Sequence, residues 1–296
     1  MTAPTSNEVS PAEGYRTFEL ELPTPRIGGL IRDLDLREEL SEDCKSELKR
    51  ALAERGVLFL PGQQITPADH ERFARIFGEL RERETFFGRP EGSPYMEVID
   101  GYGESKGTDV WHTDVSWQPL PPVATCLHAQ VLPPTGGDTI WASMTWAYAE
   151  LSPRLKSLID DLTATHTWEK SISGFVKSLP DGEAIYRRQR QDYPPVVRKV
   201  VERHPVTGLP VLYVNDLYTT HLNGIPRSEA IALLDYLTGL AAVPEYQVRF
   251  KWQPHSVVIW DNLGVQHYAV TDHKPHYRRL HRLTINDDQN TFKPAG

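Results

Sequence analysis

The sequence predicts a mostly β protein with flanking helices, an α+β chain whose core is a distorted antiparallel barrel or jelly roll. Helical patterns gather near the N-terminus, whereas strand patterns dominate the middle and the end of the chain. Further helical patterns occur as insertions around residues 153–162 and 228–242. A barrel of this kind brings side chains that are far apart in sequence to one mouth.

The first predicted helix lies between residues 41 and 55. Its apolar residues Leu48, Leu52 and Ala53 recur at helical spacing, and Gly56 follows as a stop signal. The helix therefore leads directly into a buried strand over Val57–Leu60.

A second helix is predicted to begin after Thr66, whose hydroxyl can cap the first turn. Pro67 suits the first helical position, and Asp69 complements the positive end of the helix. Gly78 is expected to end it. The apolar side chains that form its buried stripe are Phe73, Ile76 and Phe77.

The remaining chain reads as strands separated by turns. A proline-rich stretch at 119–122 precedes an apolar run at 123–131, and prolines and glycines follow at 133–137, which predicts a loop, a strand and a turn. Between 246 and 252 apolar and polar residues alternate, as in a strand with aromatic side chains on one face. Residues 257–260 and 280–285 are two further predicted strands.

Length and composition indicate one domain over residues 16–296, preceded by a disordered tail at 1–15 that is rich in Ser, Thr, Pro and Glu. Hydrophobic residues make up 39% and charged residues 24%, which is typical of a globular protein. The net charge of −8 argues against a nucleic-acid partner, since such proteins carry a basic surface.

No apolar stretch approaches the roughly 20 residues that cross a bilayer, so no membrane association is expected. The cysteines, Cys44 and Cys126, both lie in amphipathic or apolar stretches, which favours buried free thiols over a disulfide. This reading favours a reducing, cytoplasmic location.

The candidate functional residues begin with His112 and Asp114. In an extended segment they point to the same side, so both can reach one ion, while Thr113 points away. A His-x-Asp triplet alone is equally compatible with a hydrogen-bonded surface pair. With one more histidine, however, it would supply two imidazoles and one carboxylate, the set that holds iron(II) in non-haem oxygenases.

The second histidine is expected to be His267, which follows the predicted strand 257–260 and a turn at 261–264. Spacing alone leaves four competitors in the same stretch: His255, His273, His276 and His281. Downstream, Arg278 and Arg282 are four residues apart and so share one face of a strand. They could each hold an anion in a common pocket, or form a solvated strand face.

Several motifs of the chain resemble, in the same order, those of the taurine catabolism dioxygenase family, from about Ile27 to the C-terminus. They are WHTDV at 111–115, LPPTGGDTIW at 132–141, IWDN at 259–262 and QHYA at 266–269. The resemblance implies a distorted double-stranded β-helix (jelly roll). It also implies an Fe(II)- and 2-oxoglutarate-dependent oxygenase that consumes O2, releases succinate and CO2, and oxidises a C–H bond of a small anionic substrate.

On single residues, the resemblance implies that His112, Asp114 and His267 bind the iron. Arg278 matches the arginine that holds the distal carboxylate of 2-oxoglutarate, and Thr139 matches the hydroxyl that assists it. In enzymes acting on taurine, the arginine matched by Arg282 binds the sulfonate. Relatives are often dimers or tetramers, so a homo-oligomer is a further implication.

The chain departs from the taurine-specific pattern at its substrate positions. Arg83 and Phe86 stand near the places of a histidine and a tyrosine, and Thr108 stands in place of an asparagine. Ser171 and Tyr218 fall where other substrate-facing residues lie. Arg83 either meets a second acidic group of the substrate or faces solvent within the mixed-charge run 81–84.

These departures predict a substrate other than taurine: another alkyl sulfonate, an alkyl sulfate ester or a carboxylate. The same fold could instead perform a desaturation or another oxidative step, but Asp114 disfavours halogenation, which commonly requires an open position there. A non-catalytic sensor of 2-oxoglutarate is the alternative outside enzymes.

Overall fold

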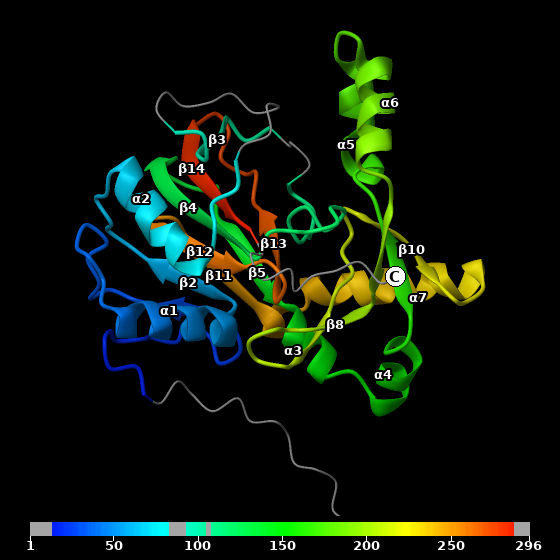
Figure 1. The fold of residues 1–296 in the computed structure, drawn as a ribbon, viewed down its shortest axis with the longest axis horizontal. Coiled ribbons are helices and arrows are strands. Elements are labelled where there is room, and N and C mark those ends of the chain that lie inside the picture. Colours follow the sequence, from blue (N-terminus) through cyan, green and yellow to red (C-terminus); the bar gives the residue numbers. More distant parts are fainter. Residues whose placement is uncertain (1–13, 83–92, 105–107, 287–296) are drawn as a thin grey trace, which may run out of the picture.

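The computed structural model describes residues 14–82, 93–104 and 108–286. Its strands are β1 (Gly29–Leu30), β2 (Val57–Leu60), β3 (Glu97–Gly101), β4 (Ala124–Val131), β5 (Thr139–Ser143), β6 (Thr163–His166), β7 (Val196–Lys199), β8 (Val201–Arg203), β9 (Pro210–Leu212), β10 (Thr219–Asn223), β11 (Gln247–Phe250), β12 (Val257–Asp261), β13 (Val265–Ala269) and β14 (Arg278–Ile285). The six-stranded sheet has the order β1-β2-β12-β4-β14-β3, and a second sheet has the order β11-β5-β13 (Figure 1). Strands from both ends of the chain thus lie side by side, as the predicted β core requires.

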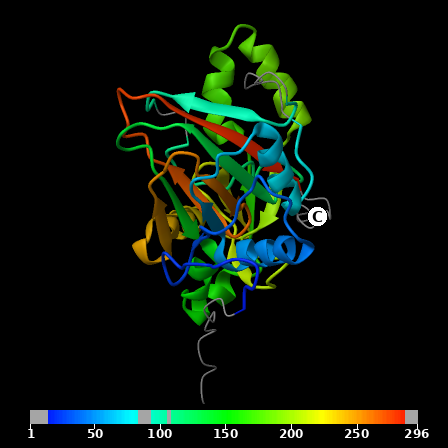
Figure 2. The same cartoon turned by 90° about the vertical axis from the view of Figure 1, so that its left-hand side faces the viewer.

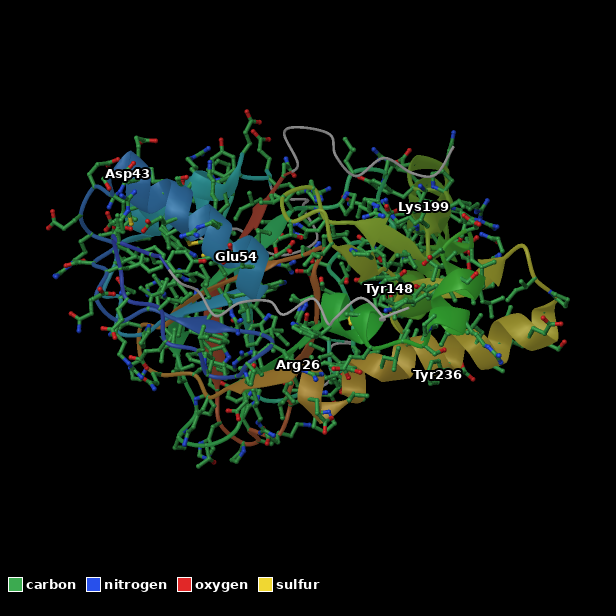
Figure 3. All side chains as sticks on the ribbon, turned by 90° about the horizontal axis from the view of Figure 1, so that it is seen from below. Arg26, Asp43, Glu54, Tyr148, Lys199 and Tyr236 are labelled. Carbon is green, nitrogen blue, oxygen red and sulfur yellow. The ribbon has the colours of Figure 1, made fainter. Side chains whose placement is uncertain are left out.

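The helices are α1 (Glu42–Arg55), α2 (Pro67–Ala74), α3 (Met144–Ala149), α4 (Pro153–Ile159), α5 (Glu169–Ser178), α6 (Gly182–Asp192) and α7 (Arg227–Gly239), with 3-10 turns η1 (Arg75–Phe77), η2 (Leu240–Ala242) and η3 (Pro244–Tyr246). Helices α1 and α2 cover one face of the six-stranded sheet, and Figure 2 shows them in front of it. Helices α5 and α6 project from the body as a hairpin (Figure 1). Helix α7 packs against β10 of the sheet β10-β6-β7 and exposes Tyr236, labelled in Figure 3.

The N-terminal helices form for the local reasons that the sequence gives. The hydroxyl of Ser41 accepts a hydrogen bond from Cys44 N at the start of α1, and Gly56 ends that helix with φ of 73°. Thr66 and Asp69 cap α2 reciprocally, because each side chain accepts from the backbone N–H of the other. Both predicted starts are therefore confirmed.

Apolar side chains fill two layers around the six-stranded sheet. On one face, Leu48 of α1 and Phe73 of α2 pack against residues of β2, β12 and β14. On the other face, Trp141 of β5 meets Phe59 and Trp260 at ring-centroid distances of 5.6 and 5.7 Å. The second layer lies between the two main sheets, so it fixes how β5 and its neighbour β13 sit over the larger sheet.

The structure adds one feature that the sequence did not predict and corrects one prediction. Helices α5 and α6 lie where no element was predicted, and neither N-cap residue, Trp168 or Asp181, makes a side-chain hydrogen bond to the first turn. Tyr246 was expected in a strand but belongs to η3, because Pro244 fixes the backbone for a tight turn and the strand starts only at Gln247.

The predicted N-terminal tail falls almost entirely outside the described residues. Its last residue, Tyr15, stacks on Phe18 at 5.1 Å and donates a hydrogen bond to Glu54 of α1 over 2.7 Å. Glu54 is labelled near the end of α1 in Figure 3. Packing therefore begins no later than Tyr15.

Within the described ranges, no helix is both long and apolar enough to cross a membrane. Cys44 and Cys126 are buried free thiols, which confirms that part of the sequence prediction. Burial raises the pKa of the Cys126 thiol far above its usual range, so this group stays protonated.

Two buried histidines, His70 of α2 and His128 of β4, face each other with ring centroids 5.6 Å apart and should make the fold sensitive to acid. The ring of His128 donates to the carbonyl of Gln63 over 3.1 Å and accepts from Gln130 over 2.9 Å, so it is held neutral. Burial, aided by His281 and His255, lowers the pKa of His128 to about 4 despite the hydrogen bond to Gln63.

We expect the free energy of unfolding to fall as the pH drops from about 6.5 to about 4. In this window an unfolded chain binds a proton at His128 that the folded chain does not, so acid favours unfolding. His128→Gln should reduce this loss of unfolding free energy by about 2 kcal/mol, as measured by urea titrations at several pH values. The exposed His276→Gln is the matched control, and an equal effect of both variants would contradict the assignment.

Candidate metal centre and anion site

Two candidate ligands, His112 and His267, are brought together by direct backbone pairing. Their main chains exchange hydrogen bonds of 3.1 and 2.8 Å as an antiparallel bridge, which places the imidazole rings 4.1 Å apart. His267 lies in the middle of β13, whose neighbour β5 positions it opposite Trp141. Of the five histidines that the sequence left as candidates, the structure therefore brings His267 to His112.

Asp114 completes the group. Its Oδ1 lies 3.8 Å from Nε2 of both histidines, which is too long for a hydrogen bond. Two ligands that each lie about 2.1 Å from one ion can be up to about 4.2 Å apart, so this spacing suits a shared metal. All three side chains are buried, and their ligand atoms fall within 4.8 Å of one another.

The protonation of the ring nitrogens fits metal binding. His112 donates from Nδ1 to the carbonyl of Val110 over 2.7 Å, so Nε2 carries the free lone pair. Burial is the largest cause that lowers the pKa of both histidines, and that of His267 reaches about 3. Both imidazoles are therefore neutral at physiological pH, as metal ligands must be.

The carboxylate of Asp114 is held by Arg282, which the sequence predicted as an anion-binding residue, and by Thr125, which the sequence did not single out. Its Oδ2 accepts from the hydroxyl of Thr125 and from Arg282, each over 2.9 Å, which leaves Oδ1 facing the histidines. Burial alone would raise the pKa of Asp114, but the charge of Arg282 and the hydrogen bond from Thr125 hold it well below its usual range. The ligand is thus an anion with one oxygen directed at the metal position.

The backbone of Asp114 is fixed as well. The side chain of Asn262 accepts from Asp114 N and donates to Asp114 O, both over 2.9 Å, and donates to Pro122 O over the same distance. Asn262 lies in the turn between β12 and β13, so this turn positions both Asp114 and His267. The IWDN motif contains Asn262, but only the three-dimensional contact reveals what its amide does.

Arg278 forms the second part of the site, at the start of β14. Its NH2 lies 3.4 Å from the hydroxyl of Thr139, which also accepts from the indole of Trp252 over 3.1 Å. Burial lowers the pKa of Arg278 to about 10, partly offset by Asp138, so the guanidinium stays charged at neutral pH. Among the described residues no carboxylate lies within ion-pair distance of it, and its Nε has no partner.

Other predicted substrate positions differ in how close they come to this centre. The Tyr218 ring stands 6.4 Å from the His112 ring, and burial together with the Asp114 charge raises its phenol pKa. Thr108 is exposed beside the end of β13, where its carbonyl accepts from Ala269 N. Ser171 donates its hydroxyl to Trp168 within its own segment. Arg83 and Phe86 lie outside the described residues.

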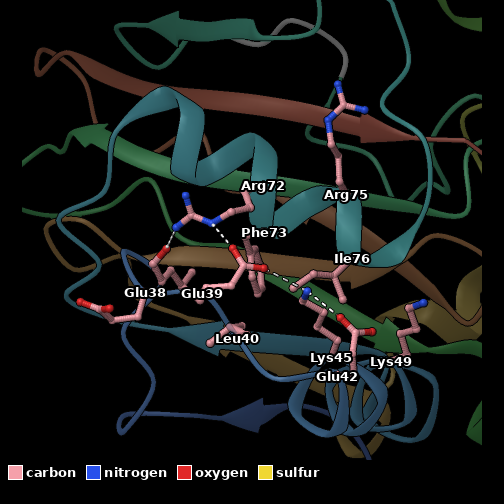
Figure 4. A pocket seen from close by; sticks show the side chains of 11 residues that line it. Glu38, Glu39, Leu40, Glu42, Lys45, Lys49, Arg72, Phe73, Arg75 and Ile76 are labelled. Atoms are coloured by element: carbon pink, nitrogen blue, oxygen red, sulfur yellow. Dashed lines mark hydrogen bonds and ion pairs between the residues drawn. The ribbon is translucent and has the colours of Figure 1, made fainter.

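A separate surface hollow of about 300 Å³ lies between α1, α2 and the segment 36–40 (Figure 4). Its charged side chains largely neutralise one another: Lys45 pairs with Glu39 and Glu42, and Arg72 pairs with Glu39. None of the predicted site residues lines it. It is therefore no part of the candidate site.

Two neutral imidazoles and one carboxylate around a single point are the ligands with which non-haem iron(II) oxygenases hold their metal while leaving coordination positions open. The chain belongs to the family described as Taurine catabolism dioxygenase TauD, TfdA family, whose model matches residues 20–284. It is accordingly an Fe(II)- and 2-oxoglutarate-dependent dioxygenase that also consumes O2.

Known proteins are similar to this chain over most of its length. An alkylsulfatase of Acinetobacter baylyi is 32% identical, with 93% of this chain and 86% of that protein covered. An alpha-ketoglutarate-dependent sulfonate dioxygenase of Saccharomyces cerevisiae is 34% identical, with coverage of 92% and 68%. The crystal structure of a taurine dioxygenase from Burkholderia xenovorans superposes with a TM-score of 0.80 at 30% identity, covering 95% and 92% of the two chains.

Thr125→Val should weaken metal binding because Asp114 loses a donor on Oδ2. Residues that orient metal ligands are typically worth about 10 to 100-fold in metal affinity, and we expect a loss of that size for Mn(II) in a calorimetric titration. Thr125→Ser keeps the hydroxyl and serves as the control. Equal affinities for both variants and the wild type would show that this hydrogen bond does not position the carboxylate.

Proposed function

We propose that His112, Asp114 and His267 bind Fe(II) on one face, and that the enzyme oxidises a C–H bond of a small organic monoanion. The observation that carries the proposal is the joint placement of this triad with Arg282, which touches Asp114 directly. The iron, with 2-oxoglutarate and O2, supplies the oxidising power. The side chains hold and orient the reactants, which is where a protein contributes most to such chemistry.

Arg278 is proposed to hold the distal carboxylate of 2-oxoglutarate, with Thr139 donating beside it. A buried guanidinium costs free energy unless a partner compensates it, and in the part of the chain that the structure describes Arg278 has no ion-paired carboxylate. A dicarboxylate cosubstrate would supply that partner through two parallel hydrogen bonds. Trp252, whose ring centre lies 5.5 Å from the guanidinium, supports its orientation.

Arg282 is proposed to bind the anionic group of the substrate, with Tyr218 close by. Because Arg282 also holds Asp114, an anion bound there lies next to the metal position, and the carbons attached to it come within reach of the oxidant. The curated relatives named for alkyl sulfates and sulfonates support an alkyl sulfate ester or alkyl sulfonate as the substrate.

With an alkyl sulfate, oxidation at the carbon that carries the ester oxygen would give an unstable hydroxylated ester. This product collapses to an aldehyde and inorganic sulfate, while 2-oxoglutarate becomes succinate and CO2. One oxygen atom of O2 enters the substrate and the other enters succinate, so the reaction balances without a further reductant.

The test is succinate formation by the Fe(II)-loaded enzyme in air, with alkyl sulfates, alkyl sulfonates and aryloxy carboxylates offered separately. We expect stimulation by a sulfate ester or a sulfonate, with release of sulfate or sulfite in equal amount to succinate. Stimulation by carboxylates alone would refute the proposed substrate class and leave the dioxygenase assignment intact.

We further propose that the two main sheets form a distorted double-stranded β-helix within a single domain over residues 16–296. The facing arrangement of the sheets and the family match over residues 20–284 support this reading. The two free thiols favour a reducing, cytoplasmic location.

A further inference from the structure

A carboxylate stands beside the proposed anion-binding arginine. Glu97 opens β3, the edge strand of the six-stranded sheet, and its Cα lies directly across from that of Arg282 on β14. Glu97 Oε2 lies 3.8 Å from Arg282 NH1, and each side chain is only 20% exposed. The charge of Glu97 is therefore poorly screened by water and acts directly on whatever Arg282 binds.

Two carboxylates, those of Asp114 and Glu97, lie beside Arg282, and a bound metal ion would offset the charge of only one of them. Asp114 faces the metal position through Oδ1, so a bound Fe(II) offsets its charge. Glu97 is not in the group of possible metal ligands among the described residues, and its only described ion pair is with Arg282. In the loaded enzyme Glu97 is thus the negative charge that opposes a substrate anion.

This opposition grows with the charge of the substrate. A sulfonate or a sulfate monoester carries a single negative charge at neutral pH, whereas a phosphate monoester carries about −1.5 to −2. These groups share a tetrahedral arrangement of oxygens, so the fork of an arginine fits each of them. Shape alone would not separate them, but a nearby carboxylate repels the second charge of the phosphate.

We propose that Glu97 is a specificity-determining residue that limits the anion at Arg282 to one negative charge, admitting sulfate monoesters and sulfonates and rejecting phosphate monoesters. The proposal rests on the proposed function, since it assumes that Arg282 receives the substrate anion. It adds to that function a reason why the abundant phosphate esters of a cell would not occupy the site.

The test measures binding without turnover. Hexyl sulfate and hexyl phosphate are titrated calorimetrically at pH 7.5 into protein loaded with Mn(II) and N-oxalylglycine, an analogue of 2-oxoglutarate. Glu97→Gln removes the charge and keeps the shape. We expect it to strengthen binding of hexyl sulfate about tenfold and of hexyl phosphate about a hundredfold, so that the preference for sulfate narrows about tenfold.

Two matched variants separate this effect from others. Asp100→Asn removes a charge from the same strand, but Asp100 pairs with Tyr277 and lies across from Arg279, so the preference should not change. Glu97→Asp keeps the charge and should keep the preference for sulfate.

An unchanged preference in Glu97→Gln would overturn the proposal. So would weaker binding of both ligands, which would mean that Glu97 only orients Arg282, or no binding of either ligand by any variant. The proposed function is judged separately, because succinate formation with another anion would still support it when hexyl sulfate and hexyl phosphate fail.

Discussion

His267→Ala will bind Fe(II) too weakly to support turnover, and succinate formation will fall to the background of the metal-free protein. The variant leaves one imidazole and one carboxylate, and a directly bound ligand is worth more than the roughly 10 to 100-fold that residues behind the ligands contribute. Metal affinity by calorimetry and succinate formation at saturating 2-oxoglutarate give two independent readouts.

The control for this variant is His276→Ala, because His276 is an exposed competitor from the same stretch of sequence. It should leave both readouts unchanged. The fold should survive in His267→Ala, since the backbone bridge to His112 does not use the imidazole. Normal metal affinity in His267→Ala would show that another histidine binds the iron.

Arg278→Met should raise the KM for 2-oxoglutarate by roughly 30-fold or more, because truncating one partner of a buried charge pair costs about 2 to 5 kcal/mol. The same variant should leave the metal-free protein as stable as the wild type or make it more stable. A buried guanidinium without a carboxylate partner is costly, and a methionine of similar length packs without that cost.

A higher KM together with unchanged or higher stability would show that Arg278 binds 2-oxoglutarate and does not stabilise the fold. Arg278→Lys keeps a charge but loses the planar fork, so its KM should lie between those of the wild type and Arg278→Met. Arg279→Ala, on the neighbouring position, should leave the KM unchanged. A loss of stability in Arg278→Met with an unchanged KM would mean that Arg278 serves the fold only.

The parts of this protein that the sequence predicted well depend on neighbouring residues. Ser41, Gly56 and Thr66 act within a few residues of themselves, so the start and stop of each N-terminal helix can be read locally. The hairpin of α5 and α6 has weaker local signals. At the start of α5 the hydroxyl of Thr167 accepts from Glu169 N, but the N-cap residue Trp168 offers no oxygen. The side chain of Asp181 caps no backbone group of α6, and its backbone is left-handed.

The site residues likewise divide into those that the sequence predicted and those that it missed. The triad was suggested by residue types, but choosing His267 among its neighbours required the family resemblance, since spacing alone could not exclude the others. Thr125, Asn262 and Glu97 were missed because each acts across strands or turns that are far apart in the sequence. A local sequence pattern cannot identify partners that come together only in the folded structure.

The backbone bridge between His112 and His267 means that folding itself sets the spacing of the two imidazoles, before any ion arrives. Iron should therefore bind a preformed site, and loss of the metal should leave the folded site intact, so that it can bind iron again. The enzyme would also tolerate exchange of its metal for another divalent ion of similar size. Metal binding should instead be sensitive to the register of β13. A single residue inserted between Gly264 and His267 would turn the imidazole to the opposite face of the strand, so the histidine would still be present but could no longer bind the metal.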